Sequence, residues 1–293
     1  MNWFLERCLA GTSVCLLVLT GFLLECFLIA PYSIPYGSTT YNLLFLFALF
    51  CTTIFMHNLY TMMFHDPSIR SVMLSNRRGP DWSYCLRCES VRPPRAHHCR
   101  RCDVCILRFD HHCTFLGQCV GYRNISSFLH LLVYSSIICL LSTCFNLPYF
   151  VNVLTPDWRL WQRVLCLLNP VPFFCLGWFS IPHFLLSIFT SACLVLGPAF
   201  AIFFVHHFLQ VCRNQTTVEI LIASPAKAIT AICHEDELRP VQYDMGRAAN
   251  LEQVLGPRWL LTFFFPFINS PPTSDGLSFP VRIKSHGSSS IQI

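Results

Sequence analysis

The sequence is poor in charged side chains. Asp, Glu, Lys and Arg together make up 12% of the 293 residues, while hydrophobic residues make up 54%. Soluble domains carry a charge on about a quarter of their residues. The shortage of charge therefore excludes an ordinary soluble protein of one or two domains, which the length alone would suggest.

Charge is missing above all from four long apolar runs: 9–32, 41–64, 128–150 and 183–212. About 20 helical residues cross the hydrocarbon core of a bilayer, so each run predicts a transmembrane helix. The first run contains Glu25 and lacks the small-residue cleavage site of a signal peptide. We expect it to stay in the protein as an anchor.

A fifth apolar run, 164–182, contains several residues that a spanning helix would not accommodate. Proline removes a backbone donor and disturbs the preceding turn of a helix. We therefore interpret this run as a re-entrant or interfacial segment. The residues that argue against a spanning helix are Asn169, Pro170, Pro172 and Pro182.

The turn between the first two runs, 33–40, has no Lys or Arg, whereas 65–127 has ten Arg. Positively charged loops stay on the cytosolic side of a membrane. The prediction is a cytosolic N-terminus, a lumenal 33–40, a cytosolic 65–127 and a cytosolic C-terminus. The formal net charge of +5 is therefore interpreted as a topology signal rather than as a nucleic-acid-binding surface.

Cysteine is abundant, and 7 of the 18 cysteines lie within 85–119 together with four histidines. Disulfides are rare in the cytosol, so metal binding is the better interpretation. Two tetrahedral zinc ions would use eight of these eleven side chains and leave three for other chemistry.

His98 and Cys99 are neighbours in the chain. Adjacent side chains of an extended backbone point in opposite directions. These two residues are therefore expected to bind different metals, which predicts two interleaved sites rather than two successive zinc fingers.

The segment YCLRCESVRPPRAHHCRRCDVCILRFDHHCTFLGQCVGYRN, 84–124, resembles the cysteine-rich domain of the DHHC protein S-acyltransferases, the palmitoyltransferases. The resemblance extends to QTTVE, 215–219, which matches the TTxE motif of that family, and to NLEQVLG, 250–256, which is similar to its C-terminal conserved segment. Four spans with this loop between the second and the third also agree with the family.

The fold class that follows is an all-α polytopic membrane protein with four transmembrane helices and a cytosolic two-zinc domain between the second and third. Along the chain we expect four parts. They are the first two helices (1–64), the cysteine-rich domain (65–127), the third and fourth helices with the extra apolar segment (128–212), and a cytosolic C-terminal region (213–293). The last part would include an interfacial segment, 258–268, and a disordered tail, 269–293.

The resemblance implies a ligand set for each zinc. One site would use Cys85, Cys88, His98 and Cys105, and the other Cys99, Cys102, His112 and Cys119. His97, His111 and Cys113 remain outside both sites. A closed zinc site has no free position for substrate, so the metals would position the chain rather than react.

The same resemblance implies that Cys113 is the nucleophile of a two-step acyl transfer. His111 would accept the thiol proton, and Asp110 would orient the ring of His111. The donor would be a long-chain acyl-CoA, and the acceptors would be cysteines on the cytosolic side of membrane-associated proteins. Golgi or endoplasmic reticulum membranes are the implied location.

Other residues carry supporting roles by resemblance. Arg92, Arg95 and His97 would contact CoA phosphates. The stretch 77–108 has eight Arg against three acidic residues, a net charge of +5, which could equally attract anionic lipid. Thr217 would bond near Asp110, Glu219 would hold the local backbone, and Asn250 would tie the C-terminal segment to the spans.

The sequence departs from the family after the nucleophile, where Thr114 and Phe115 stand in place of Pro and Trp. Thr114 does not rigidify the chain as Pro does, so chain-length preference and rate are expected to differ. Two alternatives stay open: a membrane-anchored zinc module without catalysis, and a nucleic-acid-binding finger. The intact Cys113 and His111 disfavour the first alternative. The transmembrane spans, and the lack of a finger-type helix between the ligand pairs, disfavour the second.

Overall fold

The fold is known from a computed structural model that describes residues 3–72, 79, 81–223, 243–265, 268–285 and 288–292. The chain forms two compact units. The first comprises Met1–Thr12, His57–His130 and Val205–Ile293, and the second comprises Ser13–Met56 and Leu131–Phe204. The cysteine-rich loop and the C-terminal region thus share one unit, although they are far apart in the sequence.

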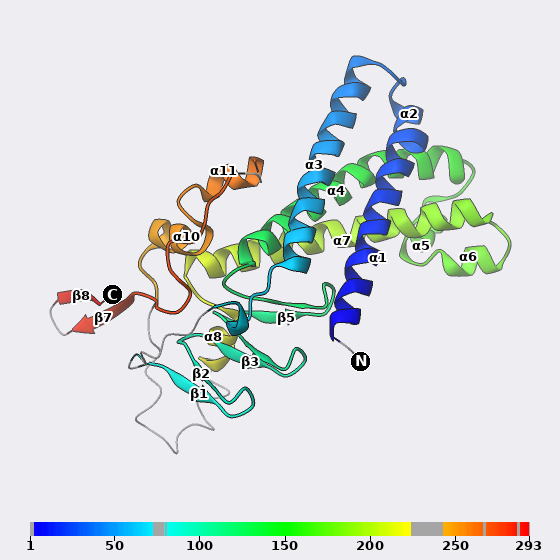
Figure 1. The fold of residues 1–293 in the computed structure, drawn as a ribbon. Coiled ribbons are helices and arrows are strands. Elements are labelled where there is room, and N and C mark those ends of the chain that lie inside the picture. The colour runs from blue at the N-terminus through cyan, green and yellow to red at the C-terminus, as the bar shows by residue number, and fades with distance from the viewer. Residues whose placement is uncertain are drawn as a thin grey trace. The chain divides into compact units, whose positions relative to one another are not determined.

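Among the described residues, four helices are long and apolar enough to cross a membrane, in agreement with the four predicted spans (Figure 1). They extend over Leu5–Ser33, Thr39–Phe64, Ile125–Leu154 and Ile181–Cys212. The first is built from α1 (Trp3–Leu24), a π-helical segment (Glu25–Ile29) and α2 (Ala30–Ser33), and the second is α3 (Thr39–Phe64). The third is α4 (Ile125–Tyr149) with a π-helical end (Phe150–Leu154), and the fourth is α7 (Ile181–Cys212).

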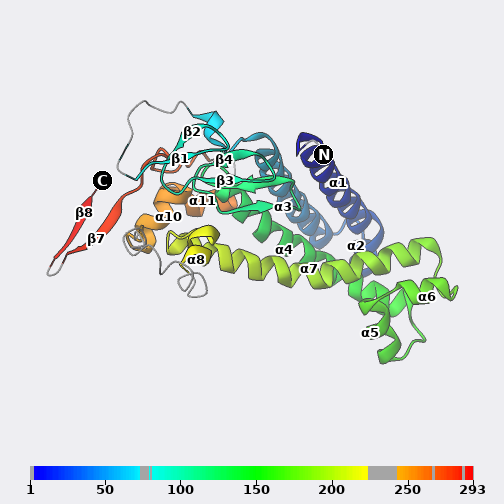
Figure 2. The ribbon, with the colours of Figure 1, turned by 90° about the horizontal axis from the view of Figure 1, so that it is seen from below.

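The fifth apolar run does not form a spanning helix. It folds into two short helices, α5 (Leu160–Leu168) and α6 (Val171–Cys175), which lie beside the start of α7 (Figure 2). Pro170 and Pro172 fall at the beginning of α6, where the missing N–H has no helical partner to lose. An aromatic cluster around Trp158 and Phe179 packs this segment.

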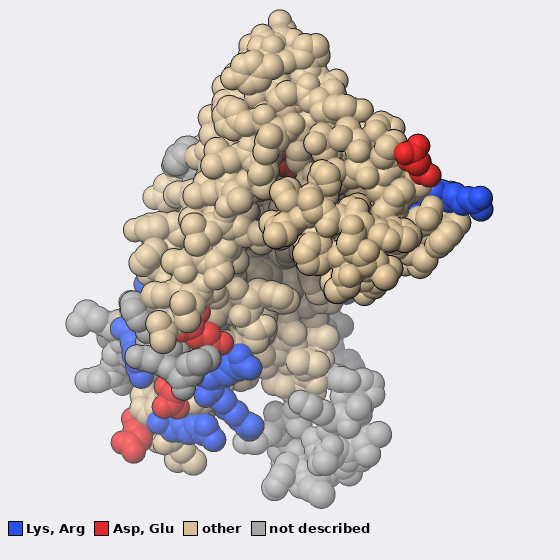
Figure 3. Space-filling view, turned by 90° about the vertical axis from the view of Figure 1, so that its right-hand side faces the viewer, with Lys and Arg blue, Asp and Glu red and all other residues tan. Residues whose placement is uncertain are grey.

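The second unit is almost free of charge, as the composition predicts for helices that face lipid, and Figure 3 shows broad surface areas without Lys, Arg, Asp or Glu. Glu25 is the exception inside a span. Its carboxylate accepts a hydrogen bond of 2.5 Å from the side-chain amide of Asn146, which is fully buried. A polar group in hydrocarbon needs such a partner, so the pair ties the π-helical segment of the first spanning helix to α4.

The cysteine-rich part of the first unit forms three antiparallel hairpins, which follow one another along the chain (Figure 1). They are β1–β2 (Ser83–Cys85, Ser90–Arg92), β3–β4 (His97–Cys99, Val104–Ile106) and β5–β6 (His111–Cys113, Gln118–Val120). A 3-10 turn, Ile69–Ser71, precedes them. The C-terminal region adds α8 (Thr217–Ile222), α10 (Arg247–Leu255), α11 (Trp259–Phe264), β7 (Val281–Ser285) and β8 (Ser288–Gln292).

The tail that we expected to be disordered makes defined contacts. Phe279 is buried in a core cluster with Ile69, Cys85 and Tyr122. The Tyr122 hydroxyl also donates a hydrogen bond to the Ser274 carbonyl. Aromatic burial of this kind offsets the entropy of ordering a short segment, which a composition rich in Ser and Pro did not indicate. Ile293 lies outside the described residues.

Candidate active site and metal centres

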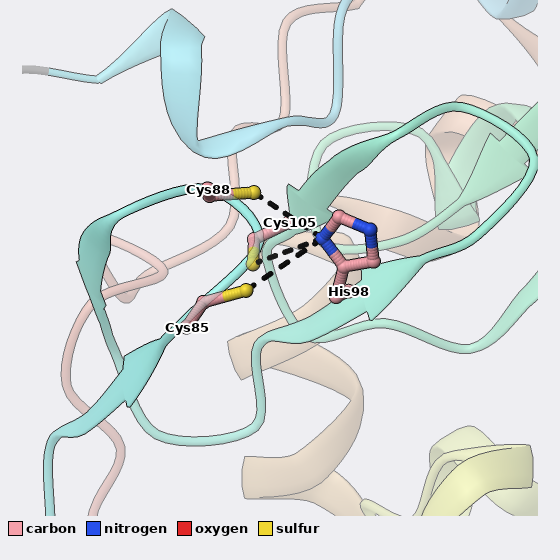
Figure 4. Close-up of side chains that lie close together, drawn as sticks. All are labelled: Cys85, Cys88, His98 and Cys105. Atoms are coloured by element: carbon pink, nitrogen blue, oxygen red, sulfur yellow. Dashed lines mark hydrogen bonds between the residues drawn. The ribbon is translucent and has the colours of Figure 1, made fainter.

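Two groups of four Cys and His side chains lie close enough together to hold a metal ion. They contain the same eight residues that the resemblance implied: Cys85, Cys88, His98 and Cys105 in one group, and Cys99, Cys102, His112 and Cys119 in the other. In the first group, shown in Figure 4, the three sulfur atoms lie 3.6, 3.2 and 4.0 Å from Nδ1 of His98.

In the second group the sulfur atoms of Cys99, Cys102 and Cys119 lie 3.6, 3.4 and 3.4 Å from Nδ1 of His112. A tetrahedral zinc with Zn–S near 2.3 Å and Zn–N near 2.0 Å separates its N and S ligands by roughly 3.5 Å. Both groups therefore fit zinc in ligand type, number and spacing.

The β-structure explains the interleaving of the two groups. His98 pairs across the β3–β4 hairpin with Cys105, and His112 pairs across β5–β6 with Cys119. Cys99, next to His98 on the same strand, points to the opposite face and joins the other group. The neighbour argument made from the sequence thus agrees with the structure.

The three hairpins repeat with a period of 14 residues, a signal that the sequence analysis missed. Cys85, Cys99 and Cys113 occupy the same position at the end of the first strand, with identical strand register. Three residues later, at the second cysteine position of the repeat, the third hairpin has Leu116. Cys113 is therefore a ligand-type cysteine whose CxxC partner is absent, which leaves its sulfur outside both metal groups.

The turn of each hairpin needs a left-handed backbone at one position. The φ angles there are 50°, 50° and 60° for Glu89, Asp103 and Gly117. At Gly117 a side chain would also meet the backbone of Arg7 at 2.8 Å, so only glycine allows the first turn of α1 to approach the third hairpin. Arg7 donates a hydrogen bond of 2.7 Å to Gln118 beside it.

Asp110, His111 and Cys113 lie next to one another. Nδ1 of His111 lies 2.7 Å from Oδ2 of Asp110, and the Cys113 side chain is near enough to the same ring to raise its pKa. Burial lowers the pKa of His111, but its interactions with Asp110 and Cys113 outweigh burial and raise that pKa to about 9. Burial raises the pKa of Asp110, yet its bonds to His111 and Thr217 bring it down to about 2.

Thr217 and Glu219 connect the TTxE segment to the cysteine-rich domain. The backbone N–H and the hydroxyl of Thr217 both donate to Asp110, at 2.9 and 3.0 Å. Glu219 caps α8 by accepting a bond of 2.9 Å from the Thr216 N–H. It also forms a salt bridge of 2.6 Å with Arg95.

Arg95 is buried, and its guanidinium is held on several sides. It donates to Glu219 and to both the side chain and the carbonyl of Asn214, and it lies over the ring of Tyr243 at 4.1 Å. To reach a CoA phosphate, Arg95 would have to give up one of these partners. Arg92 donates a bond of 2.8 Å to Ser83, its one side-chain partner among the described residues. Arg77 and Arg78 lie outside the described residues.

Asn214 is a second residue that the sequence analysis missed. Its amide donates to the Tyr243 carbonyl and to Gln253, and its oxygen accepts from Arg95 and Arg108. Asn250 similarly donates to the Cys212 carbonyl at 2.8 Å and accepts from the Met245 N–H. The two amides join the end of α7 to the C-terminal region, where buried amides need several partners.

The comparisons with known proteins agree with this site. Residues 79–224 match the family described as DHHC palmitoyltransferase. The protein named Probable palmitoyltransferase ZDHHC24 of Rattus norvegicus is 32% identical over 215 residues, 73% of this chain and 70% of that protein. Its counterpart in Danio rerio is 36% identical over 217 residues, 74% of this chain and 68% of that protein.

Palmitoyltransferase ZDHHC20 of Homo sapiens is 34% identical over 206 residues, 68% of this chain and 47% of that protein. DPSIRSVML, 66–74, and NLEQVLGPRW, 250–259, resemble the mammalian family member numbered twenty-four, and the matches to ZDHHC24 confirm that resemblance. With its metal-ligand pattern, its four apolar helices and this identity over most of its length, the chain belongs to the DHHC palmitoyltransferase family.

Proposed function

We propose that the protein moves a long-chain acyl group from acyl-CoA to Cys113, and from Cys113 to a cysteine on a membrane-associated protein. The observation that carries this proposal is the position of Cys113. It lies outside both metal groups and beside the ring of His111, whose pKa it raises, and that ring is hydrogen-bonded to the Asp110 carboxylate. A protein that only binds partners has no use for such a series.

The first half of the reaction makes the acyl-enzyme. Nε2 of His111 takes the proton of the Cys113 thiol, because its Nδ1 is engaged by Asp110. The sulfur forms a bond with the thioester carbonyl carbon, and the bond from that carbon to the CoA sulfur breaks. The CoA thiolate leaves with the proton from His111, and Asp110 stabilises the charged ring in between.

The second half reverses the roles. A thiol of the protein substrate gives its proton to His111 and attacks the acyl carbon, and the Cys113 sulfur leaves as a thiol. Each half exchanges one thioester for another, so neither needs a large driving force. The acyl chain would lie among the apolar helices, where burial contributes about 0.8 kcal/mol per CH₂.

Zinc would be held by the two groups of four ligands and would supply folding energy rather than reactivity, because each group is complete without substrate. The ligand roles are Cys85, Cys88, His98 and Cys105 for one ion and Cys99, Cys102, His112 and Cys119 for the other. Arg92 and His97 would contact CoA phosphates, and Arg95 would join them only by giving up one of its present partners. The site would face the cytosol, in Golgi or endoplasmic reticulum membranes.

The test uses the full-length protein in detergent with labelled palmitoyl-CoA. We expect a thioester-linked label on the wild type that hydroxylamine removes, and none on Cys113→Ser, with two zinc ions retained in both. A membrane-anchored zinc module without catalysis is the competing function. Equal hydroxylamine-sensitive labelling of the wild type and Cys113→Ser, or no labelling of either, would favour it.

A further inference from the structure

A third group of ligand-type side chains lies beside Cys113, and one of its members, His207, has no role in the mechanism above. Asp110, His111 and His207 each bring one ligand atom, and these atoms lie within 4.8 Å of one another. His207 comes from the last turns of α7, about a hundred positions away in the chain. The first two residues come from the start of the third hairpin.

The contacts of His207 aim one ring nitrogen at the shared carboxylate. Its Nδ1 lies 3.7 Å from Oδ2 of Asp110, and the ring stacks on His111 with centroids 5.4 Å apart. The same Nδ1 lies 3.0 Å from Oε1 of Gln210. The Asp110 side chain is 3% exposed, while His111 is 26% exposed and leaves a route from solvent.

Two imidazoles and one carboxylate are a donor set that binds zinc and other divalent metals with positions left open. The two groups of Cys and His differ from this one, because each has three thiolates and is closed. A site without thiolate holds its ion less tightly and exchanges it with the medium.

We propose that Asp110, His111 and His207 form a third, exchangeable metal site, and that a divalent ion such as Zn²⁺ bound there stops acyl transfer. This inference rests on the proposed function of Cys113. Binding needs only small movements, because Nδ1 of His111 and Oδ2 of Asp110 already face each other at 2.7 Å. His207 would exchange its bond to Gln210 for the ion.

The inhibition follows from the loss of Nδ1 of His111 to the ion. A ring whose Nδ1 has given its lone pair to a metal carries its one remaining proton on Nε2. Binding of the ion therefore sends the Nδ1 proton to solvent from a charged ring, or to Nε2 from a neutral ring. Nε2 then donates to Cys113 instead of accepting its proton, and the thiol loses its base.

The chain offers a matched control at the adjacent position. His206 lies on the same helix turn and contacts Gln210 through its Nε2 at 3.0 Å, but it does not belong to the group. His206→Gln and His207→Gln therefore make the same chemical change one residue apart.

The experiment equilibrates the full-length protein in Zn²⁺ buffers of fixed free concentration and counts bound zinc per chain. The rate of acyl-enzyme formation is measured in parallel. For the wild type and His206→Gln we expect a third ion and an at least tenfold slower rate as it binds, reversed by a mild chelator. His207→Gln should stay at two ions, with its rate changed less than twofold by zinc.

Two results would overturn the inference: a wild type that never exceeds two ions, or a His207→Gln variant that takes up the third ion equally. Cys113→Ser keeps all three proposed ligands and should still bind the third ion. If this variant failed to bind the third ion, the Cys113 thiol would be a ligand and the proposed set would be wrong. The number of bound zinc ions is measured independently of acyl transfer. A protein that shows no acylation in buffer without added zinc would therefore refute the proposed function, while the test of the third metal site would still stand.

Discussion

Thr217 holds the carboxylate of Asp110 with both of its donors, although 107 positions separate the two residues in the chain. The backbone N–H reaches Oδ1 at 2.9 Å, and the hydroxyl reaches Oδ2 at 3.0 Å. Asp110 in turn bonds the ring of His111. The start of α8, which follows the fourth spanning helix, therefore positions a carboxylate that directly precedes the third hairpin.

The hydroxyl of Thr217 can be removed with little change of shape in Thr217→Val. Hydrogen bonds to charged groups contribute about 1.5–3 kcal/mol, so we expect acyl-enzyme formation to slow by roughly tenfold to a hundredfold. The rate of hydroxylamine-sensitive labelling measures this. Thr53→Val is the control, because the Thr53 hydroxyl bonds only a carbonyl of its own helix. Equal rates in both variants would refute the role of Thr217.

Asp110→Asn keeps the size of the side chain and removes its charge. We expect acyl transfer to fall by roughly a thousandfold or more, because the amide neither stabilises a charged His111 nor fixes its tautomer. Asp110→Ala should abolish transfer. In both variants the zinc content should remain near two per chain, since Asp110 belongs to neither group of four. Loss of zinc would indicate a structural role for Asp110 instead.

Arg95→Gln breaks a buried ion pair and leaves Glu219 and Asn214 short of donors. Removing one partner of such a pair costs about 3 kcal/mol, so the melting temperature should fall by several degrees. Arg92→Gln removes only an exposed bond to Ser83 and should melt like the wild type. A thermal melt in detergent compares the two variants. Indistinguishable curves would mean that the pair does not stabilise this unit.

Removal of zinc should unfold the hairpins. Each is a short two-stranded piece, and two-stranded hairpins are marginal in water by themselves. A strong chelator should therefore release about two zinc ions per chain and abolish labelling together. Cys99→Ser removes a zinc ligand and should lose zinc to the chelator faster than Cys113→Ser, which keeps all eight ligands. An unchanged near-UV spectrum after complete zinc loss would contradict this prediction.

Leu116→Cys restores the CxxC of the 14-residue repeat. Cys113 would then have a thiol at the position that Cys88 and Cys102 hold in the first two hairpins. We expect mild oxidation to inactivate this variant through a disulfide, and a reductant to restore it. Leu116→Ala should show no such sensitivity. Oxidation that affects both variants alike would mean that the two sulfur atoms do not meet.

The sequence by itself determined the four spans, because long apolar runs with at most one charge are long enough as helices to cross a bilayer. It also determined the interleaving of the two metal groups, because His98 and Cys99 are neighbours on a strand and must point to opposite faces. The full ligand sets came from the resemblance, and the 14-residue repeat was present in the sequence but unrecognised.

Only the tertiary structure brought Thr217 and His207 to Asp110 and packed Arg95 against Glu219 and Asn214. These contacts join residues about a hundred positions apart, and no local pattern encodes the place where a helix end meets a distant hairpin. The tail residue Phe279 entered the core for the same reason. Local periodicity decides which elements form, whereas the partners of polar groups at the site depend on how those elements pack.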